Sequence, residues 1–126
     1  MSAKKAAFLL AVQMDVPPEH VADFQRVYDE EHVPNLLKVP GVTSITRFQR
    51  ADVVRIALGG VVQELAFPNE PTFTALYEIE HPDVLTTTQW SDAVEQGQWP
   101  TLVRPYTRNR RHTLHRLIVP PVKATG

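Results

Sequence analysis

The sequence contains no cysteine in its 126 residues, and this absence excludes disulfide scaffolds, thiolate zinc sites and thiol nucleophiles together. A cysteine-free chain is compatible with a reducing cytoplasm, which is the compartment that we expect. No apolar run approaches the roughly 20 residues that a membrane span requires. The apolar run at 6–12, which follows a basic start, is too short for a signal peptide and predicts a strand.

An excess of charge of either sign is also missing. Thirteen Lys and Arg residues face fourteen Asp and Glu residues, a formal net charge of -1, so no overall field attracts nucleic acid or acidic membranes. The single basic cluster, at 104–116, lacks the glycine-rich or aromatic motifs of RNA-binding proteins, and we interpret it as an exposed strand edge. A nucleic-acid binder that uses this cluster is the weakest of three hypotheses.

Several catalytic motifs are absent as well. The sequence has no Gly-x-Gly-x-x-Gly, P-loop, Gly-x-Ser-x-Gly or His-Glu-x-x-His motif, so nucleotide, nicotinamide, nucleophilic-serine and zincin mechanisms lose support. His112 and His115 would point to opposite faces of a strand and make a poor metal pair. We therefore expect no cofactor and no metal.

The pattern of apolar residues, glycines and prolines predicts one α+β domain over residues 1–126, with 43% hydrophobic residues to build its core. The predicted elements are strands at 6–16, 42–50, 73–79 and 109–119, helices at 18 to about 32 and about 83–96, and a loop at 99–108. An insertion at about 51–71 is predicted to form a hairpin around Gly59-Gly60, with a short helix as the alternative. It could cover a pocket or join a dimer interface.

His32 is the strongest candidate for chemistry. It lies one helical turn beyond Tyr28, on the same side, and Pro34 is expected to end the helix there because proline donates no backbone N–H. A helix end, together with Glu30 and Glu31, would stabilise the imidazolium and hold the pKa of His32 near neutrality. The alternative is that His32 caps the helix or packs on the proline turn.

This region also carries a family resemblance. The run Tyr28-x-x-Glu31-His32-x-Pro34, followed by Pro40-Gly41-Val42 and by Arg47-Phe48, resembles the dimeric α/β barrel proteins, in particular their EthD-like and polyketide-cyclase-like branches. The resemblance implies a ferredoxin-like βαββαβ domain with helices on one face of an antiparallel sheet. It also implies a homodimer that buries the other sheet face.

The candidate ligand-binding residues are Tyr28, Arg47, Tyr77, Trp90 and Arg108. Arg47 could bind a carboxylate with two hydrogen bonds, although an exposed arginine is the commoner outcome. Neither face of its strand is purely apolar, which suggests helices on one side and a partly polar cavity on the other. One of Trp90 and Trp99 is expected in the core and the other against a planar ligand, and Arg108 or His112 could complete an anion site.

The first functional hypothesis is a cofactor-independent isomerase or cyclase-like enzyme, a class that the resemblance implies. His32 would move a proton through an enol of a small unsaturated, carboxylated or phenolic metabolite, while Arg47 and Arg108 hold its anionic end. Cis-trans or keto-enol isomerisation of a ring-cleavage oxo-dienoate from aromatic catabolism is an example. A cofactor-free oxygenase and a non-catalytic, EthD-like ligand-binding or accessory dimer are the alternatives.

Overall fold

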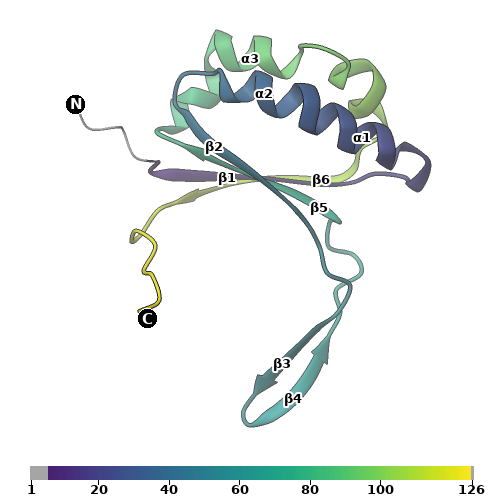
Figure 1. Cartoon of the computed structure of the whole chain (residues 1–126), viewed down its shortest axis with the longest axis vertical. Helices are drawn as coiled ribbons and strands as arrows, with labels where there is room; N and C mark the ends of the chain where they lie inside the picture. Colours follow the sequence, from purple (N-terminus) through teal and green to yellow (C-terminus); the bar gives the residue numbers. More distant parts are fainter. Residues whose placement is uncertain (1–5, 126) are drawn as a thin grey trace.

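The sheet of this protein has the ferredoxin-like strand order. The computed structural model describes residues 6–125, and its four-stranded antiparallel sheet has the order β2-β5-β1-β6. These strands are β1 (Phe8–Asp15), β2 (Val42–Gln49), β5 (Phe73–Ile79) and β6 (Arg108–Arg116). With the helices between them, they form the predicted βαββαβ arrangement, in which all helices cover one face of the sheet (Figure 1).

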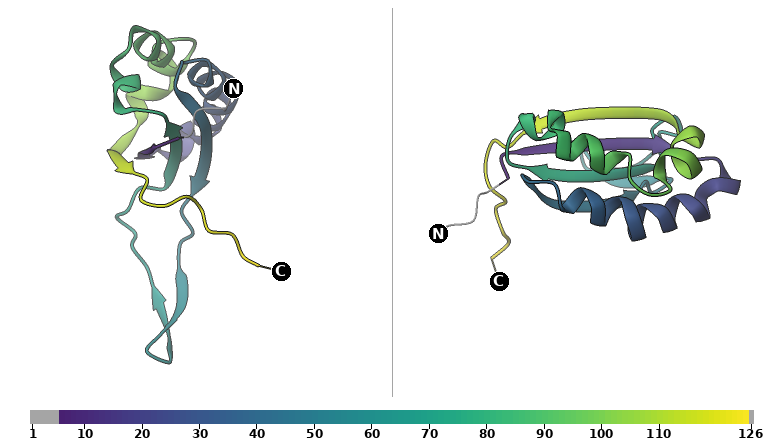
Figure 2. Two further views of the ribbon diagram at one scale, coloured as in Figure 1. Left: turned by 90° about the vertical axis from the view of Figure 1, so that its left-hand side faces the viewer. Right: turned by 90° about the horizontal axis from the view of Figure 1, so that it is seen from above.

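The helical layer consists of short segments that follow one another in two groups. The first group comprises a 3-10 turn (Pro18–His20), α1 (Val21–Val27), a π-helical turn (Tyr28–His32) and α2 (Val33–Leu37). The second group comprises a 3-10 helix (Pro82–Thr86), α3 (Thr88–Val94), a π-helical turn (Trp99–Val103) and a 3-10 turn (Arg104–Tyr106). Figure 2 shows both groups over the same face of the sheet. None of the helices between residues 6 and 125 is long and apolar enough to cross a membrane.

Pro34 does not end the first helix, so the prediction of a helix-end histidine is wrong. Val33 keeps helical angles (φ -62°, ψ -51°) and the helix continues to Leu37. Because Pro34 has no N–H to donate to the carbonyl four residues earlier, the helix widens locally, and the Val33 N–H bonds to the Tyr28 carbonyl oxygen five residues back. His32 therefore lies inside a continuous helix.

Two predictions about the C-terminal third also need correction. The predicted loop at 99–108 forms helical turns at Trp99–Val103 and Arg104–Tyr106. The last strand ends at Arg116 and not near residue 119, because the chain leaves the edge of the sheet after Leu117 donates its N–H to the Ala7 carbonyl oxygen.

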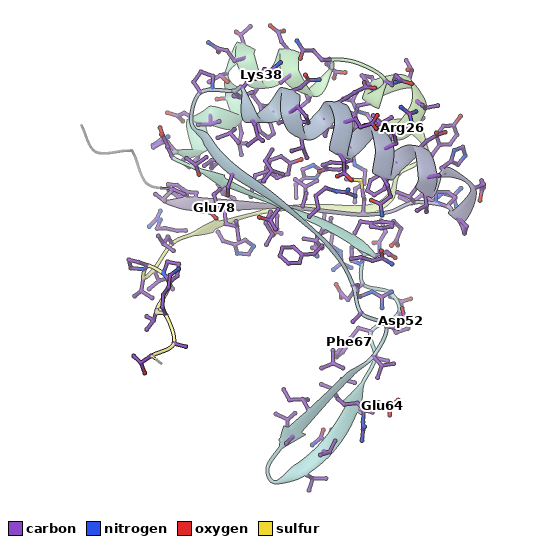
Figure 3. All side chains as sticks on the ribbon, in the orientation of Figure 1. Arg26, Lys38, Asp52, Glu64, Phe67 and Glu78 are labelled. Carbon is purple, nitrogen blue, oxygen red and sulfur yellow. The ribbon has the colours of Figure 1, made fainter. Side chains whose placement is uncertain are left out.

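The hydrophobic core lies between the helices and the sheet, and side chains fill this space (Figure 3). Alternate residues of β1 and β5 point into it, as the period of two in a strand requires. Phe24 and Val27 of α1 are almost completely buried against them, and so is Leu36 of α2. Four aromatic residues of this core, Phe24, Tyr28, Phe73 and Trp99, pack edge to face or tilted. Two of them, Tyr28 and Trp99, also lie against His32.

The insertion forms the predicted hairpin and not the alternative short helix. Within residues 6–125, strands β3 (Val54–Leu58) and β4 (Val61–Leu65) pair only with each other. They are joined at Gly59 and Gly60, whose positive φ angles suit a tight hairpin turn. We call residues 54–65 the arm. The arm projects from the side of the sheet opposite to the helices, and all its side chains except that of Leu65 are largely exposed to solvent (Figure 1).

Candidate functional site

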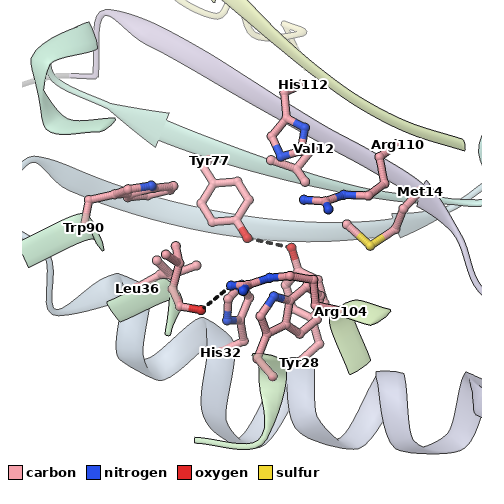
Figure 4. Close-up of a pocket in the computed structure, with 12 residues that line it drawn as sticks. Val12, Met14, Tyr28, His32, Leu36, Tyr77, Trp90, Arg104, Arg110 and His112 are labelled. Atoms are coloured by element: carbon pink, nitrogen blue, oxygen red, sulfur yellow. Dashed lines mark hydrogen bonds between the residues drawn. The ribbon is translucent and has the colours of Figure 1, made fainter. Parts of the chain in front are cut away.

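A cavity of about 260 Å³ lies between the helices and the sheet (Figure 4). Its walls are mostly apolar and aromatic, with basic side chains at one side, and they consist of Val12, Met14, Tyr28, His32, Leu36, Tyr77, Trp90, Val94, Trp99, Arg104, Arg110 and His112. This volume is slightly below the roughly 300 Å³ at which pockets for drug-sized ligands begin, so the cavity suits a small compound. The expectation that the cavity would lie on the sheet face without helices is wrong.

His32 is buried in the wall of this cavity, with 5% of its surface exposed. Its imidazole stacks on the Trp99 indole, with ring centroids 4.1 Å apart and an interplanar angle of 12°, and Tyr28 meets it edge to face. The Nδ1 atom is buried and has no hydrogen-bond partner within the part of the chain that the structure describes. No described residue therefore fixes the tautomer through Nδ1, and the ring can offer either a lone pair or an N–H to a ligand.

Burial lowers the pKa of His32 to about 4, and the positive charge of Arg104 adds to this effect. The prediction of a pKa near neutrality is wrong for two reasons. The helix does not end at His32, so it brings no free carbonyls to the ring. Of the two neighbouring carboxylates, Glu30 is exposed and Glu31 accepts hydrogen bonds from Gln98. His32 is therefore a neutral imidazole at pH 7.

Two tyrosines form a hydroxyl pair in the cavity wall. The Tyr28 and Tyr77 oxygens are 2.6 Å apart, so one hydroxyl donates a hydrogen bond to the other. Burial raises the pKa of Tyr28 to about 12 and that of Tyr77 well above its ordinary value, so both remain protonated. Neither hydroxyl has a second partner among the described residues, which leaves one O–H proton free to bond a ligand oxygen.

Basic groups from two elements border the cavity. Arg104 donates hydrogen bonds to the Val94 carbonyl oxygen at 3.0 Å and to the Glu95 carboxylate at 2.9 Å, so its guanidinium is held in place (Figure 4). Arg110 and His112 project from β6, where His112 pairs with Val12 of β1. Arg110 forms no hydrogen bond or ion pair with any residue between 6 and 125, so its guanidinium is available to a ligand in the cavity. Burial lowers the pKa of His112, and the positive charge of Arg110 lowers it further.

The structure thus brings His32 together with three of the predicted ligand-binding residues, Tyr28, Tyr77 and Trp90. Trp99 is the buried tryptophan, and Trp90 is half-buried and meets Tyr77 edge to face.

The two predicted anion-binding arginines lie elsewhere, and two other arginines border the cavity. Arg47 lies outside it, because its guanidinium bonds to Asp29 and Gln25 and covers the Tyr28 ring at 4.5 Å. Arg108 is exposed at the start of β6. Sequence reasoning missed Arg104 and Arg110. The two-residue period of β6 puts Arg110 on the same side as His112, but the sequence predicts a loop at 99–108 and gives no direction for the Arg104 side chain.

The arrangement of helices and sheet matches a solved structure. An ethyl tert-butyl ether D (EthD) family protein from Bacillus halodurans C-125 superposes with a TM-score of 0.54 over 88% of this chain and 99% of that chain. The chain has an EthD-like fold. The two sequences are only 10% identical, so the similarity between the two proteins concerns the fold alone. No protein-family model matches the sequence, and no curated protein matches it either.

Proposed function

We propose that this EthD-like protein is a cofactor-independent enzyme that moves a proton within a small unsaturated anion, either carboxylated or phenolic. The observation that carries this proposal is a buried, neutral imidazole with an unpartnered nitrogen in an aromatic cavity that is basic on one side. Buried polar atoms are rarely left without a partner, and ligand binding is one explanation of an exception.

Each polar group has a role in this mechanism. The anionic group of the substrate binds at Arg110 and Arg104, and its planar body lies among the aromatic rings. Neutral His32 accepts a proton from a carbon next to a carbonyl group, and the free O–H of the tyrosine pair stays protonated and donates a hydrogen bond to the resulting enolate oxygen. The imidazolium then returns the proton to another carbon, which completes a keto-enol or double-bond isomerisation.

The bound anion would itself make His32 a stronger base. In the empty cavity, burial and the Arg104 charge both disfavour the imidazolium. An anion beside Arg104 offsets the second effect and attracts the imidazolium, so the pKa of His32 rises toward neutrality when substrate binds. The histidine therefore becomes basic only when a substrate is present.

A second candidate function is a ligand-binding dimer without catalysis. The observation that favours it is that no carboxylate between residues 6 and 125 bonds to the His32 ring, which is held by stacking on Trp99. In either case we propose that two copies pair through the sheet face that carries no helices, since an uncovered sheet face with apolar residues needs a partner.

The test is ultraviolet spectroscopy of the protein with a panel of carboxylated oxo-dienoates, with no cofactor added. We expect a spectral change that His32→Ala slows by at least about 100-fold, as for the loss of a general base. His81→Ala is the matched control, because His81 is exposed and lies outside the cavity. Full turnover by His32→Ala would exclude the mechanism. Binding without a spectral change would support the second candidate, and a rate that depends on oxygen would indicate an oxygenase.

A further inference from the structure

The sheet face without helices is wide and carries both apolar and polar side chains, with its titratable residues near the ends of the strands. The strand registers put these residues on this side, and we call them the bare face: Leu9, Ala11, Gln13, Ser44, Thr46, Phe48, Thr74, Leu76, Glu78, Arg111, Thr113 and His115. Phe48 is largely exposed there. Sheets of this kind normally bury such a face against another layer.

The arm has one apolar side. Cross-strand partners in a hairpin share a side, so Val54, Ile56, Leu58, Val61 and Leu65 lie together with Gln63. The opposite side carries Arg55, Ala57, Val62 and Glu64. Figure 3 shows Glu64 on the side of the arm that faces away from the C-terminal segment of the same chain. A lone two-stranded hairpin is only marginally stable in water, so the exposed apolar side needs a surface to cover.

The C-terminal segment provides an apolar groove on the same side of the sheet. After β6 the chain turns away from the helices, and Ile118 is 93% exposed (Figure 1). This segment and the start of β1 form a groove of about 670 Å³ lined mainly by Phe8, Leu9, Leu117, Val119 and Pro120. We call it the tail groove.

The arm and the tail groove lie at opposite ends of the strands. The arm connects Gln49 to Phe73, which pair with each other at one end of the sheet. The tail follows Arg116, which pairs with Phe8 at the other end. A twofold axis in the plane of the bare face and perpendicular to the strands exchanges these two ends. Such an axis brings each arm to the end of the other copy's sheet where the tail groove lies, and an axis along the strands would bring arm against arm.

We propose that the arm is a dimerisation arm, whose apolar side occupies the tail groove of a second copy in a twofold dimer built on the two bare faces. The pairing is self-complementary, as a twofold interface must be. The size of the bare face also argues for it. Four strands of about eight residues span roughly 26 Å by 19 Å, or about 500 Å². A standard interface buries about 800 Å² per partner, so the sheet face alone falls short and the arm supplies the remainder.

Two adjacent valines of the arm provide the first test. Val61 and Val62 are 62% and 59% exposed but lie on opposite sides of the arm. In sedimentation velocity of the full chain, Val61→Asp should raise the dimer dissociation constant by at least about 30-fold, the size of a hot-spot effect, while Val62→Asp changes it little. A dimer that tolerates both substitutions would overturn the role of the arm but leave the pairing of bare faces intact. A monomeric wild type would overturn both. Neither result concerns catalysis, which the His32 variant tests separately.

Cross-linking tests which surfaces meet. Because the chain has no cysteine, Val61→Cys and Leu117→Cys each introduce a single reactive thiol. With a bifunctional maleimide, we expect cross-linked dimers when the two variants are mixed and few when either is alone. Efficient cross-linking of Val61→Cys to itself would show arm against arm and overturn the proposal, as would the absence of cross-links in the mixture. Far-UV circular dichroism checks that each variant is folded. We expect both to fold, because Val61 and Leu117 are exposed.

Discussion

Lowering the pH from 7 to 4 should reduce the stability of the fold by about 3 kcal/mol through His32 alone. The pKa of this histidine is 6.5 in an ordinary environment and about 4 in the folded protein. The unfolded chain therefore binds the proton more tightly, and stability falls as the pH drops below 6.5. The slope approaches about 1.4 kcal/mol per pH unit and flattens once the pH falls below the folded-state value.

The assay is urea unfolding of the wild type and of His32→Phe at several pH values. Phenylalanine keeps an aromatic ring against Trp99, whose centroid lies 4.1 Å from that of His32, but it does not titrate. The difference between the two curves isolates His32, because other groups with lowered pKa values, such as His112 and Asp15, are present in both proteins. We expect the wild type to lose about 3 kcal/mol relative to the variant between pH 7 and pH 4.

Two parallel curves would refute the reasoning. They would mean that the imidazole is charged or solvated in the folded protein, which would also remove the neutral base from the proposed mechanism. The same pair of proteins tests the effect of a ligand. A saturating anion that binds beside Arg104 should reduce the difference between the curves, because it raises the pKa of His32 in the folded state.

Three further predictions concern stability and ligand binding. Tyr77→Phe should lower the free energy of unfolding by about 1–2 kcal/mol, because it leaves the buried Tyr28 hydroxyl without its partner. In urea unfolding, the Tyr28→Phe/Tyr77→Phe double variant should lose less stability than the sum of the two single variants, and strict additivity would argue against the hydrogen bond. Gly41→Ala should lower the thermal midpoint, because Gly41 has a φ of 92° and its Cβ would clash with Val84; an unchanged midpoint would contradict this geometry. Arg47→Met should destabilise the fold by about 1 kcal/mol, through loss of its contact with the Tyr28 ring, without weakening ligand binding in a titration; weaker binding would restore Arg47 as a ligand residue.

Local patterns predicted the fold class, the strand order and the hairpin, but not the helical turns after Gln98 and not the site. Alternation and glycine placement predicted the strands and the hairpin at Gly59, because these features depend on neighbours in sequence. Pro34 misled the prediction because its effect depends on whether the surrounding packing can hold a widened turn, which no local rule describes. On β6, the period of two puts Arg108 and Arg110 on one side, but only the register against β1 shows that Arg110 borders the cavity and Arg108 does not.

The π-helical turn at Tyr28–His32 has a consequence for the phase of the whole helix. It holds one residue more than an α-helical turn, so the segments before and after it are rotated relative to each other by about 100° from a regular helix. Deleting one residue from this turn would remove this extra rotation and swing Phe24 and Val27 away from the sheet, while His32 and Leu36 kept their place. The length of the chain here, as much as any side chain, therefore allows one helix to serve both the core and the cavity.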